Sequence, residues 1–514
     1  MSAPKYLIDT NVFIKLEDAA AVSPEFALLL QLTARHGIGV FIHEAAVDDI
    51  SRDQNFERRR ISLSKLEKFQ KLSRVRGLDR SALEARFGRL QKPNDIVDAT
   101  LLHALHIGVA DFLVTEDQGL HDRARKYAAD LVGRVLYVAD AVSLLRTTYE
   151  PLTVSIPFVE EVDAHSIPLT EPIFTSLREG YPEFDDWWRT NCVKGLRKCW
   201  VVMADGEVSG LVVRKTEEEG HTDAKLPGRK ILKICTFKVR SEQRGIKLGE
   251  LLLKQILWFA QTNGFDLTYV TTFSTQSTLI DLITYYGFKN TYTNMRGELV
   301  YEKSLYRTPL GEPADGNLFD AARLNYPRFY AGEDVTAFGI PIREPFHEVL
   351  FPELAERQQG DLFEFGGYRA PNRSGNTIRK VYLCRAPVSI EPPGAILFFY
   401  KGKSHKLPSQ AITTVGIFEN MSLAHSTEEL RRLAGGRSVY SSQQLDAFGA
   451  SEQRPVKVLN FLLVGHINPP ISLPDLLSMQ VFSHHPPQSI VRFDRKKLIP
   501  ILEKIRNFGF HILV

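Results

Sequence analysis

Segment 6–14 (YLIDTNVFI) constrains the fold more than any other part of this 514-residue chain. Its apolar run ends in Asp9, and Thr10 and Asn11 follow at once. A strand this close to the N-terminus that closes with Asp-x-Asn places a carboxylate at the carboxyl edge of a parallel sheet, where α/β proteins keep their ligands. We therefore expect a parallel α/β sheet with a site at the end of its first strand.

Further acids follow at the ends of later elements. They are Asp48 and Asp49 after the second apolar run, Asp95 and Asp98 at the start of a helix, and Asp117 after the run FLVT. Clustered carboxylates repel one another unless a cation joins them, and hard oxygen ligands suit Mg²⁺ or Mn²⁺. Metal-assisted hydrolysis of phosphodiesters is the matching chemistry. The alternative is that Asp95 caps a helix, Asp117 lies in a turn and the other acids are solvated.

The ordered acids resemble those of a PIN-domain nuclease over residues 1–146. The matching motifs are IDTN at 8–11, VDDI at 47–50, DATLLHA at 98–104 and LVTED at 113–117. The resemblance implies that Asp9, Asp98 and Asp117 bind metal. Asp49 takes the place of a customary glutamate, with Asp48 and Glu44 as competitors. The implied catalytic and metal-binding set is Asp9, Asp49, Asp98 and Asp117, which would hold Mg²⁺ or Mn²⁺ and activate water.

Charge is distributed unevenly, although the net charge is only +3. Between residues 52 and 92 there are 13 Lys and Arg against 5 Asp and Glu. An acidic pocket beside a basic helical arm suits an enzyme that acts on a polyanion, because the pocket holds metal and the arm holds phosphates. Arg58, Arg59 and Arg60 are the expected nucleic-acid contacts in this arm. The alternative is a solvated amphipathic helix.

Composition predicts a cytoplasmic globular protein. The hydrophobic fraction is 44%, and no apolar run reaches the roughly 18–20 residues that a membrane-spanning helix requires. No basic-then-apolar leader is present at the N-terminus. The four cysteines form no CxxC pair, which argues against a zinc knuckle and a disulfide framework and favours a reducing compartment.

The sequence predicts an α/β multidomain protein with three modules. We expect a parallel-sheet α/β/α domain over 1–146, a linker over 147–172, an α/β domain over 173–305, a second linker over 306–329, and a β-barrel with helices over 330–514.

The second module contains a strand over 233–239, a helix over 248–262 and a glycine-containing loop between them. Free N–H groups at a helix N-terminus suit a pyrophosphate, and Arg244 and Lys247 would add positive charge. With a hairpin over 200–213 and the later YYGF at 285–288, this pattern resembles a GNAT acetyltransferase. The resemblance implies acetyl-CoA binding by Val239, Arg244, Gly245, Ile246, Lys247, Leu248 and Gly249.

Two positions depart from the GNAT pattern. Lys247 stands where the loop usually has its central glycine. Ile283 lies four residues before Gly287, where many members carry the tyrosine that reprotonates the leaving thiolate. Tyr285 and Tyr286 are the available substitutes, although neither has the expected register.

The third module carries PPGAILFFYKGK at 392–403 and AITTVGIF at 411–418. These segments are similar to the PUA-like superfamily, including its ASCH and EVE branches, which implies a nucleic-acid-binding barrel. The expected contacts are Tyr400, Lys401, Lys403 and Lys406, with Phe398 and Phe399 as further stacking candidates. The alternative places Phe398 and Phe399 in the core, and at least one must be there because adjacent strand residues face opposite sides.

The leading hypothesis is a metal-dependent ribonuclease coupled to an acetyl-CoA-binding module and a nucleic-acid-binding module. RNA is preferred over DNA by analogy with both end modules. One alternative is an acetyltransferase that acts on RNA, aminoacyl-tRNA or protein, and another is a non-catalytic regulator that senses CoA. A homodimer and a protein antitoxin stay open as partners, and toxin–antitoxin biology, RNA processing and phage defence stay open as roles. No membrane partner is expected.

Overall fold

The computed structural model describes residues 4–9, 11–12, 24–51, 56, 59–60, 63, 66–67, 69–72, 77–149, 159–204, 206–240, 248–305, 317–354, 377–404, 407–434, 440, 442–483, 485–506, 510 and 512–513. These residues form two compact units. The first unit holds the described residues of 1–153 and 422–458, and the second holds those of 154–240, 247–421 and 459–514.

The first unit is built on a five-stranded parallel sheet, as expected. Its strand order is β3-β2-β1-β4-β5. The strands are β1 (Lys5–Ile8), β2 (Gly39–Ile42), β3 (Gln70–Lys71), β4 (Phe112–Val114) and β5 (Val135–Leu136). The chain builds outward from β1 to β3 on one side and from β4 to β5 on the other. The strand order therefore reverses between β1 and β4, and in open α/β sheets ligands bind outside the carboxyl ends of the strands at such a point.

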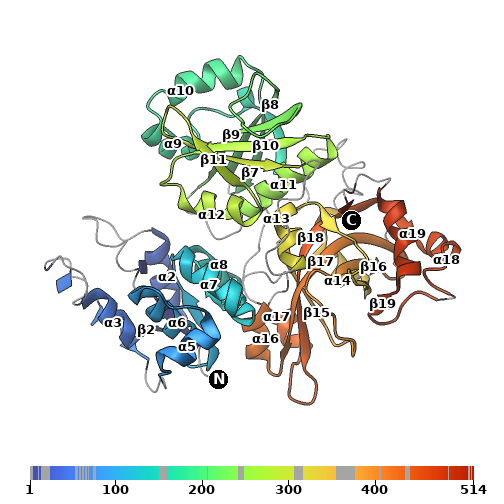
Figure 1. The fold of residues 1–514 in the computed structure, drawn as a ribbon, viewed down its shortest axis with the longest axis horizontal. Helices are drawn as coiled ribbons and strands as arrows, with labels where there is room; N and C mark the ends of the chain where they lie inside the picture. The colour runs from blue at the N-terminus through green and yellow to red at the C-terminus, as the bar shows by residue number, and fades with distance from the viewer. Residues whose placement is uncertain are drawn as a thin grey trace. The chain divides into compact units, whose positions relative to one another are not determined.

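Helices cover both faces of this sheet (Figure 1). Tyr6 and Ile8 point into one core cluster and Leu7 into the other, as the two-residue period of a strand requires. The first cluster includes residues of α2 (Pro24–Arg35) and α8 (Val138–Tyr149). The second includes residues of α5 (Arg80–Phe87), α6 (Pro93–His106) and α7 (Gln118–Tyr127). A further helix, α3 (Glu44–Ser51), follows β2.

The first unit also receives a segment from far along the sequence. Helices α16 (Thr427–Ala434) and α17 (Ser442–Phe448) contact the 3₁₀ helix η1 (Ala129–Arg134) and α8 respectively. Arg432 Nη1 lies 3.4 Å from Asp111 Oδ1. The predicted third domain is therefore interrupted, because residues 422–458 pack with the N-terminal domain.

The second unit begins with a seven-stranded sheet of order β11-β12-β10-β9-β8-β7-β6. The strands are β6 (Val159–Asp163), β7 (Lys198–Ala204), β8 (Glu207–Glu218), β9 (Lys230–Val239), β10 (Leu267–Thr272), β11 (Lys289–Thr293) and β12 (Leu299–Ser304). Two of its helices, α11 (Leu248–Thr262) and α12 (Ser277–Tyr285), follow β9 and β10. Strand β6 falls in the predicted linker 147–172 yet pairs along its length with β7, so this domain starts earlier than expected.

A six-stranded mixed sheet of order β15-β18-β17-β16-β14-β19 follows in the second unit. Its strands are β14 (Ala337–Ile342), β15 (Arg379–Cys384), β16 (Ile396–Lys401), β17 (Ala411–Ala424), β18 (Val456–Ser472) and β19 (Val491–Phe493). The helices around it are α13 (Leu318–Asn325), α14 (Glu344–Leu350), α18 (Leu473–Ser478) and α19 (Arg495–Arg506), and a small pair joins β13 (Phe329–Tyr330) to β20 (Ile512–Leu513). Helix α13 occupies part of the predicted linker 306–329.

One apolar core joins both sheets of the second unit. It contains Ile256 and Leu257 of α11 together with Phe398 of β16 and Leu462 of β18. The two predicted modules therefore form one packed body. None of the four cysteines, all of which lie in the described part of the chain, forms a disulfide. Among the helices that the structure describes, none has the length and apolar character needed to cross a membrane.

Candidate functional site

Asp9 lies directly after β1 at the point where the strand order reverses. Its backbone N–H donates to the carbonyl of Val114 at 3.0 Å, which holds the end of β1 against β4. Asp9 is only 5% exposed, and Thr115 Oγ1 donates to Asp9 Oδ2 at 2.7 Å. This carboxylate is therefore buried and oriented by the neighbouring strand end.

Thr115 and Asn11 join the two strand ends into one rigid edge. The Asn11 amide nitrogen donates to Thr115 Oγ1 at 3.1 Å, and the Asp117 backbone N–H donates to the same oxygen at 3.0 Å. Glu116 N–H donates to Asn11 Oδ1 at 3.1 Å. A hydroxyl offers one donor and two acceptor positions, and Thr115 uses all three. The sequence motifs contained both Thr115 and Asn11, but only their position at a strand end could have suggested this role.

Asp98 of α6 is electrostatically linked to both other acids. Burial raises its pKa to about 8, and repulsion from Asp9 and Asp117 adds to the effect, while Arg123 opposes it. Such repulsion acts strongly only between neighbouring charges. Asp9 directly follows β1 and Asp117 lies three residues after β4, two neighbouring parallel strands, while Asp98 belongs to α6. That these three carboxylates form one metal site stays a prediction.

Asp117 also has a local role, because it is the N-cap of α7. Its carboxylate accepts from the Leu120 backbone N–H at 3.2 Å. Its side chain is nevertheless exposed, so one oxygen can serve the cap while the carboxylate still faces the site. The capping interpretation and the metal-binding interpretation are compatible for this residue.

Asp95 has the structural role that the alternative interpretation gave it. The N–H groups of Gln91 and Lys92 donate to its Oδ2 at 2.7 and 2.8 Å, and Arg123 Nη2 lies 2.9 Å from its Oδ1. Asp95 therefore starts α6 and anchors Arg123. Asp98 lies one turn later on the same helix, takes no part in this capping interaction and is the candidate metal ligand of α6.

The fourth expected ligand cannot be placed. Asp49 and its competitor Asp48 belong to α3, but their side chains lie outside the described residues, and Glu44 is exposed in the first turn of that helix. Three carboxylates with oxygen donors suit Mg²⁺ or Mn²⁺ by their chemistry. Among the described side chains, no three His, Cys, Asp or Glu residues lie close enough together to bind one metal ion.

The basic arm is described only in part. Arg58 lies outside the described residues, Arg60 is exposed, and Arg59 is half-buried with its guanidinium 5.6 Å from the centroid of the Phe56 ring. The phosphate contacts expected of these arginines stay a prediction.

The expected cofactor loop falls mostly outside the described residues, namely at 241–247. Val239 ends β9 and is half-buried, whereas Leu248 is a core residue with 2% exposure. A Cβ on Gly249 would lie 3.1 Å from the Leu282 side chain of α12. Gly249 therefore permits close packing of α11 against α12.

Strand β9, which precedes this loop, and strand β10, which follows α11, stop pairing before β9 ends. Strand β9 pairs in parallel with β10 only over residues 231–234, although β9 continues to Val239 alongside β8. Every side chain from 235 to 239 is half-buried, in contrast to the buried Ile231, Leu232 and Ile234. The carboxyl half of β9 thus borders an opening in the parallel pair.

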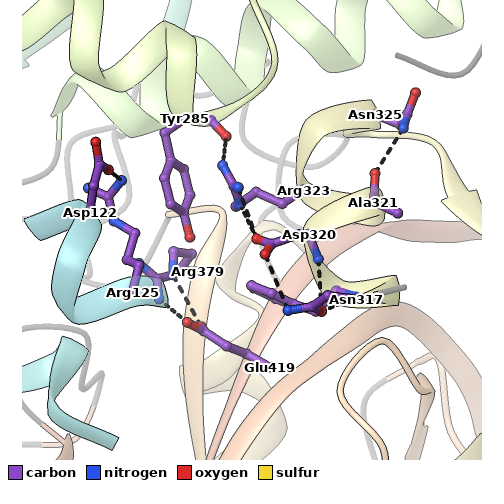
Figure 2. Close-up of polar contacts among 11 residues, drawn as sticks. Asp122, Arg125, Tyr285, Asn317, Asp320, Ala321, Arg323, Asn325, Arg379 and Glu419 are labelled. Atoms are coloured by element: carbon purple, nitrogen blue, oxygen red, sulfur yellow. Dashed lines mark hydrogen bonds and ion pairs between the residues drawn. The ribbon is translucent and has the colours of Figure 1, made fainter. Parts of the chain in front are cut away.

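Ile283, where the resemblance places a tyrosine, is fully buried in α12. Tyr286 is 1% exposed and donates to Glu250 Oε1 at 2.9 Å, and burial raises its pKa well above the usual range. Figure 2 shows the Tyr285 ring beside Arg323 and Arg379, whose guanidinium carbons lie 4.3 and 5.4 Å from the ring centroid. Both tyrosines therefore have structural partners.

The expected nucleic-acid contacts on β16 need correction. Tyr400 and Lys401 are 1% and 3% exposed, because β16 lies between β14 and β17 with both faces covered. Neither side chain can reach a base or a phosphate from this position. Phe398 and Phe399 are both core residues. Lys403 is exposed, and Lys406 lies outside the described residues.

No family model matches this sequence, and no curated protein matches it. Solved structures do resemble parts of it. An N-acetyltransferase from Thermoplasma acidophilum in complex with coenzyme A covers 29% of this chain and 99% of its own, with 14% identity and a TM-score of 0.23. A GNAT family acetyltransferase from Elizabethkingia anophelis with acetyl-CoA bound covers 29% and 98%, with 14% identity and a TM-score of 0.23.

A structure described as ASCH from Zymomonas mobilis covers 32% of this chain and 94% of its own, with 19% identity and a TM-score of 0.22. With TM-scores below 0.5, these similarities identify no activity. We therefore infer the function of each unit from the geometry of the chain itself.

Proposed function

We propose that the first unit is a PIN-like, metal-dependent ribonuclease. The observation that carries the proposal is the buried Asp9 carboxylate at the reversal point of a parallel sheet, where Thr115 Oγ1 holds it at 2.7 Å and Asp117 follows the neighbouring strand. Burial and repulsion from Asp9 and Asp117 raise the pKa of Asp98, which supports a site of like charges. A fold gains nothing structural by gathering like charges in a partly buried site. Such a site becomes favourable when a divalent cation binds.

Each described residue has a defined task in this proposal. Asp9, Asp98 and Asp117 would hold Mg²⁺ or Mn²⁺, and the bound ion would supply an activated water and stabilise charge on the phosphate. Thr115 fixes the orientation of Asp9, and Asn11 fixes Thr115. In the metal-free protein, the raised pKa of the Asp98 carboxyl favours its protonated form near neutral pH, which limits repulsion among the three carboxylates.

The test is cleavage of a defined single-stranded RNA in Mn²⁺ by wild type, Asp98→Asn and Asp130→Asn. Asp130 is an exposed acid of η1 in the same unit and serves as the matched control. We expect Asp98→Asn to lose at least about a hundredfold in rate, because it removes a ligand charge but preserves shape. Asp130→Asn should match wild type. Equal rates for all three proteins would refute the assignment.

We also propose that the second unit binds an acyl-CoA, a distinct function supported by the separation of β9 from β10 beyond residue 234. An opening in a parallel pair exposes backbone N–H and C=O groups that an extended amide-containing ligand can use. Because Tyr285 and Tyr286 have structural partners, we assign acyl-CoA binding and sensing to this unit and no acyl transfer.

All four tryptophans of the chain belong to the second unit, so their fluorescence reports its unfolding. Acetyl-CoA at a hundredfold excess over Kd should stabilise this unit by about 2.7 kcal/mol. AMP at the same concentration is the control for nonspecific nucleotide binding. A fluorescence transition that does not move in millimolar acetyl-CoA would reject the binding.

A further inference from the structure

A cleft of about 500 Å³ opens where the connection between α5 and α6 meets α7 in the first unit. Its charged and aromatic lining residues are Arg89, Lys92, Asp95, Asp122, Arg123, Lys126 and Tyr127. Four of these seven carry positive charge, two are acids and one is an aromatic ring, and Asp122 already pairs with Arg125 outside the lining. The cleft therefore combines the two features that bind single-stranded nucleic acid, namely cations for phosphates and a stacking surface for a base.

The positive charges in the cleft are only partly compensated. Arg123 pairs with Asp95, and its Nη1 also donates to the carbonyls of Phe87 and Arg89 at 3.0 and 3.1 Å, so it shapes the cleft wall. Arg89, Lys92 and Lys126 are exposed, and none of the three forms an ion pair with a carboxylate in the described part of the chain. Three cations are thus available to an anionic ligand.

Tyr127 is held in place by the backbone of α5. A Cβ on Gly88 would lie 2.3 Å from the Tyr127 ring, so the ring rests directly on this glycine. Gly88 ends α5 with φ of 82°, a conformation that L side chains rarely adopt. Tyr127 is nevertheless 43% exposed, and Lys126 Nζ lies 5.3 Å from its ring centroid. The protein therefore presents a fixed, solvent-accessible aromatic surface beside a cation.

The cleft borders the three carboxylates Asp9, Asp98 and Asp117, which we call the acidic edge. Arg123 lines the cleft, and its Nη2 lies 2.9 Å from Asp95 Oδ1, one helical turn before Asp98 on α6. Asp117 caps α7, and Gly119, two residues later, lines the cleft. A strand bound in the cleft would lead directly to the three carboxylates.

We propose that this cleft binds the phosphate and base of a single-stranded RNA nucleotide that flanks the bond cleaved at the acidic edge. The proposal rests on the proposed nuclease function. It assigns the substrate contacts to Arg89, Lys92, Lys126 and Tyr127, which differ from the Arg58–Arg60 arm and from β16.

Binding can be measured apart from cleavage, with the full chain, a labelled single-stranded RNA and EDTA. The test variant is Arg89→Ala with Lys126→Ala. The control is Arg454→Ala with Lys5→Ala, which removes one exposed arginine and one exposed lysine of the same unit outside both the cleft and the basic arm at 52–92. Two lost phosphate contacts at about 0.7 each should make the slope of log K against log salt shallower by about 1.4. We expect affinity at 50 mM salt to fall about tenfold for the test variant and to stay unchanged for the control.

The aromatic contribution has its own readout. Tyr127→Leu should weaken binding about tenfold without changing the salt slope, because stacking releases no counterions, and Tyr127→Phe should restore it. Gly88→Ala should act like Tyr127→Leu by displacing the ring. Duplex RNA of the same length should bind equally to wild type and Tyr127→Leu, since its bases are already stacked.

The outcomes separate this proposal from the nuclease proposal. If the cleft variants bind RNA like wild type while wild type cleaves in Mn²⁺, the cleft assignment is overturned and the nuclease stands; an acidic protein would then be the next occupant to consider. If the cleft variants lose binding but wild type never cleaves, the cleft stands and the nuclease proposal fails.

Discussion

Two groups of charged side chains in this protein, one at the end of β1 and β4 and one around Glu353, differ in the balance of positive and negative charge. At the acidic edge of the first unit, Asp9, Asp98 and Asp117 gather like charges, and the pKa of Asp98 rises to about 8. In the second unit, Lys254 Nζ lies 2.6 Å from Glu353 Oε1 and His466 Nε2 lies 3.6 Å from Glu353 Oε2. Although burial opposes ionisation, Lys254 and Lys380 hold the pKa of Glu353 well below its usual range.

This difference in charge balance indicates a structural role for the Glu353 cluster and a ligand-binding role for the acidic edge. The Glu353 cluster joins α11 to the C-terminal sheet, and in it a carboxylate lies against cations, so opposite charges stabilise one another. The acidic edge has an excess of one sign, which only an added cation or added protons can relieve. The same substitution of carboxylate by amide should therefore have opposite effects on the stability of the two units.

The largest effect is expected for Glu353→Gln. It would leave Lys254 and Lys380 buried without their anionic partner and should lower the free energy of unfolding of the second unit by about 3–5 kcal/mol. Urea unfolding followed by tryptophan fluorescence measures this directly. Glu503→Gln, at an exposed position of α19, is the matched control. A cost below about 1 kcal/mol for Glu353→Gln would remove the contrast between the two groups.

A second prediction concerns acid destabilisation of the second unit. Burial lowers the pKa of His347 to about 3, and this residue bonds Thr413 Oγ1 at 2.7 Å in the folded state. A depressed folded pKa gives stability that is present above the unfolded pKa of about 6.5 and lost as pH falls toward 3.

At pH 5 the loss from this histidine should be about 2 kcal/mol, since one pKa unit is worth about 1.4 kcal/mol. The tryptophan transition followed from pH 8 to pH 5 measures it, and His347→Gln should flatten the dependence. An unchanged slope in that variant would assign the acid sensitivity to other groups.

The third prediction has the opposite sign. Because the pKa of Asp98 is raised, it contributes stability below an unfolded pKa near 4, and this contribution is lost as pH rises through about 8. Asp98→Asn should therefore stabilise the metal-free first unit at pH 8 by about 1–2 kcal/mol, allowing for solvent screening. Hydrogen exchange at β1 and β4 in EDTA, corrected for intrinsic rates, reports the change. Destabilisation at pH 8 would mean that Asp98 supports the fold.

The smallest effect is expected at the Arg432–Asp111 pair of the first unit. Its atoms lie 3.4 Å apart and both side chains are partly exposed, so Arg432→Ala should cost below about 1 kcal/mol. The same exchange measurement applies, read at η1. A loss near 3 kcal/mol in the free energy of unfolding would show that the first unit depends on α16 for its stability.

The acidic edge could be predicted from the sequence because its residues follow apolar strands or open a helix. Parallel strands bring their carboxyl ends together whatever lies between them, so Asp9 and Asp117 follow the ends of neighbouring strands although more than a hundred residues separate them. Asp95 and Asp98 could not be told apart in this way, since both open the same helix and only the hydrogen bonds show which one caps it.

Other features depend on tertiary context that local patterns do not carry. The run FFYK at 398–401 is equally compatible with an edge strand and a central strand, and only the pairing of β16 with β14 and β17 buries Tyr400 and Lys401. Of the cleft residues, Lys126 and Tyr127 are neighbours on α7, whereas Arg89 lies in the connection between α5 and α6, and no spacing links the two segments. Their association depends on the contact between Gly88 and the Tyr127 ring.

The measurement that tests the central claim most directly is calorimetric titration of Mn²⁺ into wild type, Asp98→Asn and Asp130→Asn near pH 7.5. The account predicts saturable binding to wild type with release of a proton from Asp98, visible as a heat that depends on the ionisation enthalpy of the buffer. Asp130→Asn should behave like wild type, and Asp98→Asn should lose most of the affinity and all of the proton release. Identical binding heats and identical buffer dependence in all three proteins would contradict the account.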